Sequence, residues 1–180
     1  MEKYIPILKE PKIIENCSTS LFLKGLKREI ENSKGWNFLY PLEADIEHKF
    51  PKLTITTQDT QFLLGLCFSL LIQIYEKGGS EYFNLDINFC GASIKDKNTY
   101  LNPHTDHSDN ELPFPVLKVL GILNFDWDPK LGGNFIWGDK EYPLLFNNFL
   151  IFDPQVIHSN SPILCNKKRI AIDFTVPAKI

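Results

Sequence analysis

A short polar segment near the middle of the chain contains residue types that bind metal ions. His104 and Asp106 are separated by a single residue, and in an extended segment such residues point to the same side. An imidazole nitrogen and a carboxylate oxygen from this pair could therefore reach one ion. A third ligand has to come from elsewhere in the chain, and His158, which follows Asp106 by 52 residues, is the candidate.

Two imidazoles and one carboxylate on one face of an octahedron leave three coordination positions open, and this donor set is typical of non-haem Fe(II) oxygenases. The short His-x-Asp spacing is weak evidence by itself, because it also suits a polar turn after Asn102-Pro103. A second pair, His107 and Asp109, has the opposite strand phase. The first pair is favoured because it directly follows an extended stretch, residues 100–103, whereas the second falls in a sequence typical of a loop.

The last predicted strand, residues 169–176, has two different faces because side chains alternate along a strand. One face is apolar and carries Ile170, Ile172, Phe174 and Val176. The other face carries Arg169, Ala171, Asp173 and Thr175. The apolar face should pack under the helices. The face with a guanidinium and a carboxylate should then line a wet or ligand-filled space.

Arg169 is the candidate ligand-binding residue on that polar face. It follows His158 by 11 residues and is one of only two arginines in the chain, the other being Arg28. A guanidinium can hold a carboxylate through two parallel hydrogen bonds, so the position suits an anionic ligand. The alternative is a surface arginine that continues the basic run Lys167-Lys168.

Two helices are predicted in the first eighty residues. The first starts from an N-cap at Ser18 or Ser20 and ends before residue 35, with apolar residues at helical spacing. The second starts at Thr57 or Asp59 and ends near Lys77. Its apolar residues surround almost the whole circumference, which predicts a helix buried against a sheet.

The sequence after residue 79 predicts strands. Short apolar segments at 82–90, 118–125, 134–137, 148–152 and 169–176 alternate with turn residues, a pattern typical of a sandwich or barrel. Residues 95–99 are predicted to form a solvated loop. We therefore expect one domain over residues 1–180, with a helical flank at 1–80 and a β core at 82–176.

The composition limits the class of protein. The chain has 180 residues, of which 43% are hydrophobic and 23% charged, and its formal net charge is −3. These values are ordinary for a globular protein and exclude a wholly disordered or collagen-like chain. The slight negative charge argues against nucleic acid as a partner.

The cysteines and the apolar runs indicate the compartment. The four cysteines are at least 23 residues apart, which excludes a Cys-x-x-Cys pair and favours buried, reduced thiols. The longest apolar run, residues 62–72, is shorter than the roughly 18 residues that span a bilayer. The N-terminus lacks a basic-then-apolar signal segment. We therefore expect a cytoplasmic protein with no membrane partner.

Several segments, taken in order, resemble a known family. They are Pro103-His104-Thr105-Asp106, the stretch 121–128 (GILNFDWD), Gly132-Gly133-Asn134-Phe135, Phe152-Asp153-Pro154 with His158, and the stretch 169–174 (RIAIDF). Their order and spacing resemble the Fe(II)/2-oxoglutarate-dependent oxygenases, in particular the prolyl-4-hydroxylase-like branch. The likeness covers about residues 82–176, and the first eighty residues match only as a generic helical flank.

The resemblance implies a mainly β fold, a double-stranded β-helix (jelly roll) with N-terminal helices packed on one sheet. It makes His104, Asp106 and His158 the Fe(II) ligands and Arg169 the partner of the distal carboxylate of 2-oxoglutarate. O2 is the implied oxidant, and ascorbate is a further candidate cofactor. The implied reaction is hydroxylation of a substrate C–H bond, in a prolyl residue of a protein or peptide or in a free amino acid or small metabolite.

The sequence departs from the family pattern around the co-substrate. Many members carry a serine two residues after the arginine, where this chain has Ala171, and Ile122 stands where prolyl hydroxylases often place a tyrosine. Tyr100 and Thr105 are candidates to supply a missing hydroxyl. An alternative interpretation is a cupin-like metal-binding jelly roll: an isomerase, a dioxygenase without 2-oxoglutarate or a sugar-binding module. A non-catalytic binding protein of the same fold is a further alternative.

Overall fold

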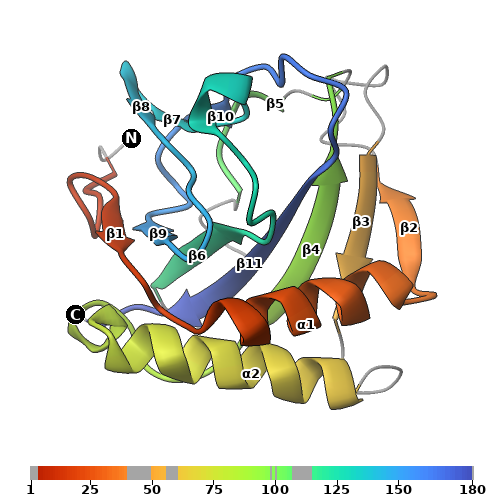
Figure 1. The fold of residues 1–180 in the computed structure, drawn as a ribbon. Helices are drawn as coiled ribbons and strands as arrows, with labels where there is room; N and C mark the ends of the chain where they lie inside the picture. The colour runs from red at the N-terminus through yellow and green to blue at the C-terminus, as the bar shows by residue number, and fades with distance from the viewer. Residues whose placement is uncertain are drawn as a thin grey trace.

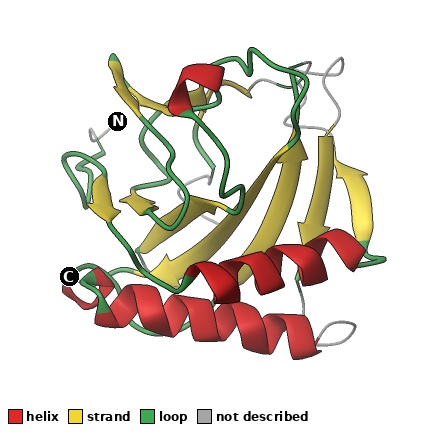
Figure 2. Cartoon of the chain, viewed as in Figure 1, coloured by secondary structure: helices red, strands yellow, loops and turns green. Residues whose placement is uncertain are grey.

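Two antiparallel sheets and two helices make up most of the chain (Figures 1 and 2). The computed structural model describes residues 4–39, 50–55, 61–97, 99, 101–106 and 115–179. Within these ranges the larger sheet has seven strands, in the order β1 (Lys12–Ile14), β9 (Phe149–Phe152), β6 (Val116–Ile122), β11 (Arg169–Pro177), β4 (Phe89–Lys95), β3 (Phe50–Thr54) and β2 (Trp36–Leu39). The smaller sheet has four, in the order β5 (Leu101–His104), β10 (His158–Asn160), β7 (Phe135–Trp137) and β8 (Lys140–Tyr142).

Both helices, α1 (Ser20–Asn32) and α2 (Gln61–Glu76), cover the outer face of the larger sheet (Figure 1). The residues that fill this layer are fully or almost fully buried and include Leu23, Leu26, Ile30, Leu70, Leu71, Ile74, Ile170, Ile172, Phe174 and Val176. The prediction that alternate residues of the last strand pack under helices is therefore confirmed. So is the predicted jelly-roll class, mainly β with helices packed on one sheet.

Helix α1 begins one residue away from the predicted caps. Its N-cap is Thr19, which has an extended backbone and whose Oγ1 accepts a hydrogen bond from the Phe22 amide. Ser18 instead donates its hydroxyl to Gln73 Oε1 on α2 at 2.7 Å. That contact ties the start of α1 to α2.

Helix α2 is less buried than its sequence predicts. The start predicted at Thr57 or Asp59 lies outside the described residues. Leu63, Cys67, Leu70, Leu71 and Ile74 face the sheet and α1. Phe62 and Phe68, by contrast, are 71% and 39% exposed, because the sheet covers only one side of this outer-layer helix.

The strand prediction over 82–90 was wrong for most of its length. Residues 82–88 form turns and irregular backbone after a short 3-10 helix, η1 (Gly79–Glu81), and β4 starts only at Phe89. This strand continues to Lys95, so the predicted solvated loop loses its first residue to the sheet. Small residues such as Gly91, Ala92 and Ser93 carry little hydrophobic signal, although β4 lies between β3 and β11.

The first eighty residues are not purely helical. The short strands β1, β2 and β3 add to the two edges of the larger sheet, β1 beside β9 and β3 beside β4. Strands of three to five residues are too short for alternation to stand out in sequence. The strands predicted over 118–125, 134–137, 148–152 and 169–176 correspond to β6, β7, β9 and β11.

The cysteines agree with the expectation of reduced thiols. Cys17, Cys67 and Cys90 are buried, Cys165 is half-buried, and all four are free. Burial raises the pKa of the Cys17 thiol to about 12, which keeps it unreactive. None of the described helices has the length and apolarity needed to cross a membrane.

Candidate metal centre

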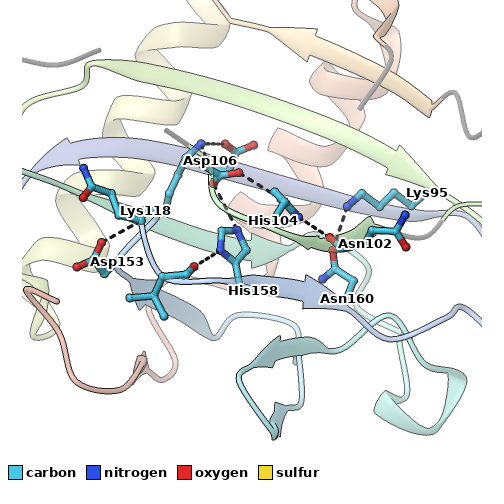
Figure 3. Close-up of polar contacts among 11 residues, drawn as sticks. Lys95, Asn102, His104, Asp106, Lys118, Asp153, His158 and Asn160 are labelled. Carbon is cyan, nitrogen blue, oxygen red and sulfur yellow. Dashed lines mark hydrogen bonds and ion pairs between the residues drawn. The ribbon is translucent and has the colours of Figure 1, made fainter. Parts of the chain in front are cut away.

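The structure brings His104, Asp106 and His158 together in the wall of one cavity (Figure 3). His104 ends β5 and His158 begins β10, and the two residues are direct partners across this antiparallel pair. His104 Nε2 lies 3.4 Å from Asp106 Oδ1, and His158 Nε2 lies 3.6 Å from Asp106 Oδ2. One donor atom from each residue lies within 4.8 Å of the others. This spacing is compact enough for all three to reach a single ion.

Hydrogen bonds to the backbone fix the orientation of both imidazoles. His104 Nδ1 lies 2.7 Å from the Asn102 carbonyl oxygen, and His158 Nδ1 lies 2.8 Å from the Val156 carbonyl oxygen. A carbonyl oxygen only accepts, so Nδ1 carries the proton in each ring. The Nε2 atom of each ring then lies beside Asp106, where it could donate a hydrogen bond to the carboxylate or, without its proton, bind an ion; a backbone partner for the other nitrogen is typical of metal-binding histidines.

Aromatic side chains form the wall behind His158. Its ring stacks on Phe135, with a centroid distance of 5.5 Å, and meets the edge of Phe152 at 4.8 Å. His104 lies on the opposite side, with its ring centroid 4.6 Å from that of His158. His158 is only 5% exposed. The packing therefore holds the ring in one orientation and keeps water off one side of the centre.

The loop that leads into His158 is anchored from the N-terminal segment. Asp153 is fully buried, and its Oδ2 accepts hydrogen bonds from the Tyr4 hydroxyl and the Ile7 amide, both at 2.8 Å. Its Oδ1 accepts from the Gln155 amide at 3.0 Å. The Asp106 amide in turn donates to the Pro154 carbonyl oxygen at 2.9 Å. The same loop therefore positions two of the three candidate ligands.

A buried ion pair lies beside the carboxylate of the centre. Lys118 Nζ on β6 lies 3.0 Å from Asp173 Oδ2 on β11 and 3.8 Å from Asp106 Oδ2. Burial raises the pKa of Asp106, but the two imidazoles and the Lys118 ammonium outweigh burial and hold that pKa well below its usual range. Burial likewise lowers the pKa of Lys118, and Asp173 with Asp106 more than restores it. Both groups are therefore charged at neutral pH.

Replacing Lys118 by methionine should destabilise the fold. The substitution keeps the side-chain volume but leaves the largely buried Asp173 carboxylate without its cation, and breaking such a pair costs about 3 kcal/mol. Urea unfolding of the two proteins measures the difference. The double variant Lys118→Met/Asp173→Leu should recover most of the loss, because it removes the carboxylate 3.0 Å from the lysine and leaves only the more distant Asp106 without this cation. Equal stabilities of wild type and Lys118→Met would contradict the expectation.

Arg169 lines the same cavity, and the residue is only 1% exposed. Its Nε and Nη1 atoms have no hydrogen-bond partner among the described residues. The predicted alternative of a surface arginine is therefore wrong. Burial lowers the pKa of Arg169 to about 10, so the guanidinium is still charged at neutral pH. Buried donors of a charged group normally find acceptors, so this arrangement indicates a place for an anion.

Gly133 makes room for that guanidinium. Its backbone has a φ of 72°, in the left-handed region that favours glycine, and a Cβ there would lie 3.0 Å from Arg169 Nη1. Any larger residue at position 133 would therefore crowd the Arg169 side chain, which explains the second glycine of the Gly132-Gly133 pair. The cavity has a volume of about 100 Å³, and both the candidate metal ligands and Arg169 line it.

Several other residues singled out in the sequence either lie outside the described residues or have apolar side chains. Tyr100 lies outside the described residues, and so do His107 and Asp109 of the second His-x-Asp pair. Ala171 lines the cavity, and Ile122 is fully buried among apolar side chains, so neither offers a hydrogen bond from its side chain.

Sequence reasoning missed other polar residues that line the cavity, namely Lys52, Ser93, Lys95, Lys118 and Asn160. Two of them carried a signal that could have been used. Lys118 interrupts the apolar run 116–120, and Lys95 directly follows a stretch of small and apolar residues. A lysine in a buried strand needs an anionic or polar partner.

Comparison with known proteins identifies the fold. No family model matches the sequence, and no curated protein has a significantly similar sequence. Solved structures do match. A prolyl-4-hydroxylase from Pseudomonas putida superimposes with a TM-score of 0.65 at 14% identity, over 94% of this chain and 92% of that chain.

Two further matches differ in their reactions. A prolyl hydroxylase from Trichoplax adhaerens, in complex with a hypoxia inducible factor peptide fragment, gives a TM-score of 0.66 at 16% identity, over 93% of this chain and 83% of that chain. SnoN, the non-heme alpha-ketoglutarate-dependent epimerase of nogalamycin biosynthesis, gives 0.69 at 10% identity, over 93% and 78%. At these identities the matches show a shared fold, which is the jelly roll of 2-oxoglutarate and Fe(II)-dependent oxygenases.

Proposed function

We propose that this protein is an Fe(II)- and 2-oxoglutarate-dependent oxygenase. One observation carries the proposal: a compact His-Asp-His cluster and a buried guanidinium with unsatisfied donors line the same cavity. The donor set of two imidazoles and one carboxylate fits Fe(II) and leaves coordination positions open. The guanidinium fits the far carboxylate of a dicarboxylic acid.

Each residue has a defined part in the proposed reaction. His104, Asp106 and His158 would hold Fe(II), and Arg169 would hold the distal carboxylate of 2-oxoglutarate. With O2, the bound metal and co-substrate supply the oxidising power that attacks a substrate C–H bond. The protein orients the ligands through the Asn102 and Val156 carbonyls and shields one side of the centre with Phe135 and Phe152.

For the reaction we propose hydroxylation, with a prolyl residue of a protein or peptide as the first candidate substrate. Support comes from the Leu-Asn-x-Asp-Trp-Asp stretch at 123–128 and from the fold shared with two prolyl hydroxylases, one of them bound to a peptide. A free amino acid or small metabolite is the second candidate. Because an epimerase shares the fold, analysis of the product has to distinguish hydroxylation from epimerisation. We further propose that the protein acts in the cytoplasm.

Anaerobic spectroscopy tests the proposed class. Protein loaded with Fe(II) without oxygen should develop a weak visible charge-transfer absorption when 2-oxoglutarate is added, because the co-substrate would chelate the metal. Admitting O2 should then convert 2-oxoglutarate to succinate, with faster conversion when a true substrate is present. Bound iron without any such absorption at any 2-oxoglutarate concentration would instead favour the cupin-like interpretation.

A further inference from the structure

A second buried basic side chain, Lys95, lines the same cavity as Arg169. Lys95 is the last residue of β4 and lies directly opposite Arg169 in the antiparallel register of β4 and β11. Both side chains line the cavity, and both residues are more than nine-tenths buried, with exposures of 7% and 1%. The sequence had indicated a solvated loop here, so the burial of Lys95 requires an explanation of its own.

The Lys95 side chain crosses the cavity toward the smaller sheet. Its Nζ donates a hydrogen bond to Asn160 Oδ1 on β10 at 3.1 Å (Figure 3). This hydrogen bond fixes the position of the Lys95 amine at the wall of the cavity. Burial and the neighbouring Arg169 guanidinium lower the pKa of Lys95 well below its usual range. An anion bound between the two cations would remove this repulsion.

Among the described residues, apolar side chains stand at two positions where the family pattern has hydroxyl groups. Ala171 lies two residues beyond Arg169 on β11, and Ile122 pairs with it across β6. Ser93 on β4 pairs with Ala171 and lies two residues before Lys95. Among the described residues that line the cavity, it is the one that carries a hydroxyl group. Ser93 is therefore the competing candidate.

We propose that Lys95 and Arg169 together bind the distal carboxylate of 2-oxoglutarate, with the Lys95 ammonium in place of the missing hydroxyl. The inference rests on the proposed function and deepens it. It makes Lys95 a binding residue that sets selectivity for a dicarboxylic over a monocarboxylic 2-oxo acid. The Arg169 guanidinium would supply two parallel hydrogen bonds, and Lys95 a third charge-assisted one.

Calorimetric titration of the anaerobic Fe(II)-loaded protein with two ligands tests this assignment. The ligands are 2-oxoglutarate and 2-oxovalerate, which has the same number of carbons but a methyl group in place of the distal carboxylate. Lys95→Met should weaken 2-oxoglutarate binding about ten- to a hundredfold, the loss expected for one hydrogen bond between charged groups. It should leave 2-oxovalerate binding unchanged. Lys95→Arg should restore part of the 2-oxoglutarate affinity.

The controls separate the contact from general damage to the site. Lys97→Met removes an exposed lysine two residues away and should change neither affinity. If Lys95→Met does not fold, Lys95→Gln replaces it, since an amide can still donate to Asn160 Oδ1. Equal losses for both ligands, no loss at all, or a larger selective loss in Ser93→Ala would each overturn the assignment. Wild-type protein that binds iron but no 2-oxoglutarate would overturn the proposed function itself, and this inference with it.

Discussion

His158→Ala and His104→Ala should each abolish turnover and weaken Fe(II) binding strongly. Each substitution removes one of three donors in a cluster where no other described histidine or carboxylate lies within reach. Loss of an outer partner of a metal ligand already costs about ten- to a hundredfold in metal affinity, and loss of the ligand itself should cost more. Titration with Fe(II) under anaerobic conditions, followed by an assay of succinate formation, measures both effects.

His107→Ala is the matched control for these variants. His107 belongs to the second His-x-Asp pair and lies outside the described residues, so the sequence argument alone separates the two pairs. We expect His107→Ala to keep most of its metal affinity and turnover. An inactive His107→Ala together with an active His104→Ala would mean that the wrong pair has been assigned to the metal.

Arg169→Met should raise the concentration of 2-oxoglutarate needed for half-saturation by at least about a hundredfold. The variant loses two hydrogen bonds and the charge that would hold the distal carboxylate, and each charge-assisted hydrogen bond is worth about 1.5–3 kcal/mol. Fe(II) affinity should change little, because the guanidinium makes no contact with the His-Asp-His cluster among the hydrogen bonds and ion pairs of the described residues. Anaerobic titration of the charge-transfer absorption with 2-oxoglutarate gives the comparison.

Arg28→Met provides the control for removing an arginine. Arg28 lies on α1, its side chain is 73% exposed, and it pairs only with the neighbouring Glu29 among the described residues. We expect its 2-oxoglutarate titration to match that of the wild type. If Arg169→Met also matched the wild type, the buried guanidinium would have a packing role against Gly133 and the anion site would lie elsewhere.

Period-two alternation allowed the key strand to be predicted from sequence. The stretch 169–176 places apolar and polar residues on opposite faces, and β11 has this arrangement, with Ile170, Ile172 and Phe174 in the helix-facing core and Arg169 and Asp173 lining the cavity. The pattern is clear because one face is buried under helices and the other faces polar groups. The spacing of His104 and Asp106 suggested the pair, but β5 ends at His104 and Asp106 lies in the bend after it, held by its backbone hydrogen bond to Pro154.

The parts that could not be predicted depend on contacts distant in sequence. Lys95 looks like the start of a charged loop until β11 is placed beside it, and only then does it become a partner of Arg169. The exposure of Phe62 follows from the position of α2 in the outer layer, which its uniformly apolar sequence does not reveal. Strand β10 has only three residues, too few to recognise in the sequence, and it is held in the sheet by pairing with β5 and β7.

The two sheets contribute different halves of the cavity, and this division has a mechanical consequence. His104 and His158 belong to the smaller sheet, whereas Lys95 and Arg169 belong to the larger one. Under the proposed function, a co-substrate that reaches from the metal to the two cations would act as a crosslink between the layers. Part of its binding free energy, about 2.7 kcal/mol at a hundred times the dissociation constant, would then oppose separation of the sheets. Occupancy would make the short-stranded sheet stiffer and slower to exchange its amide protons.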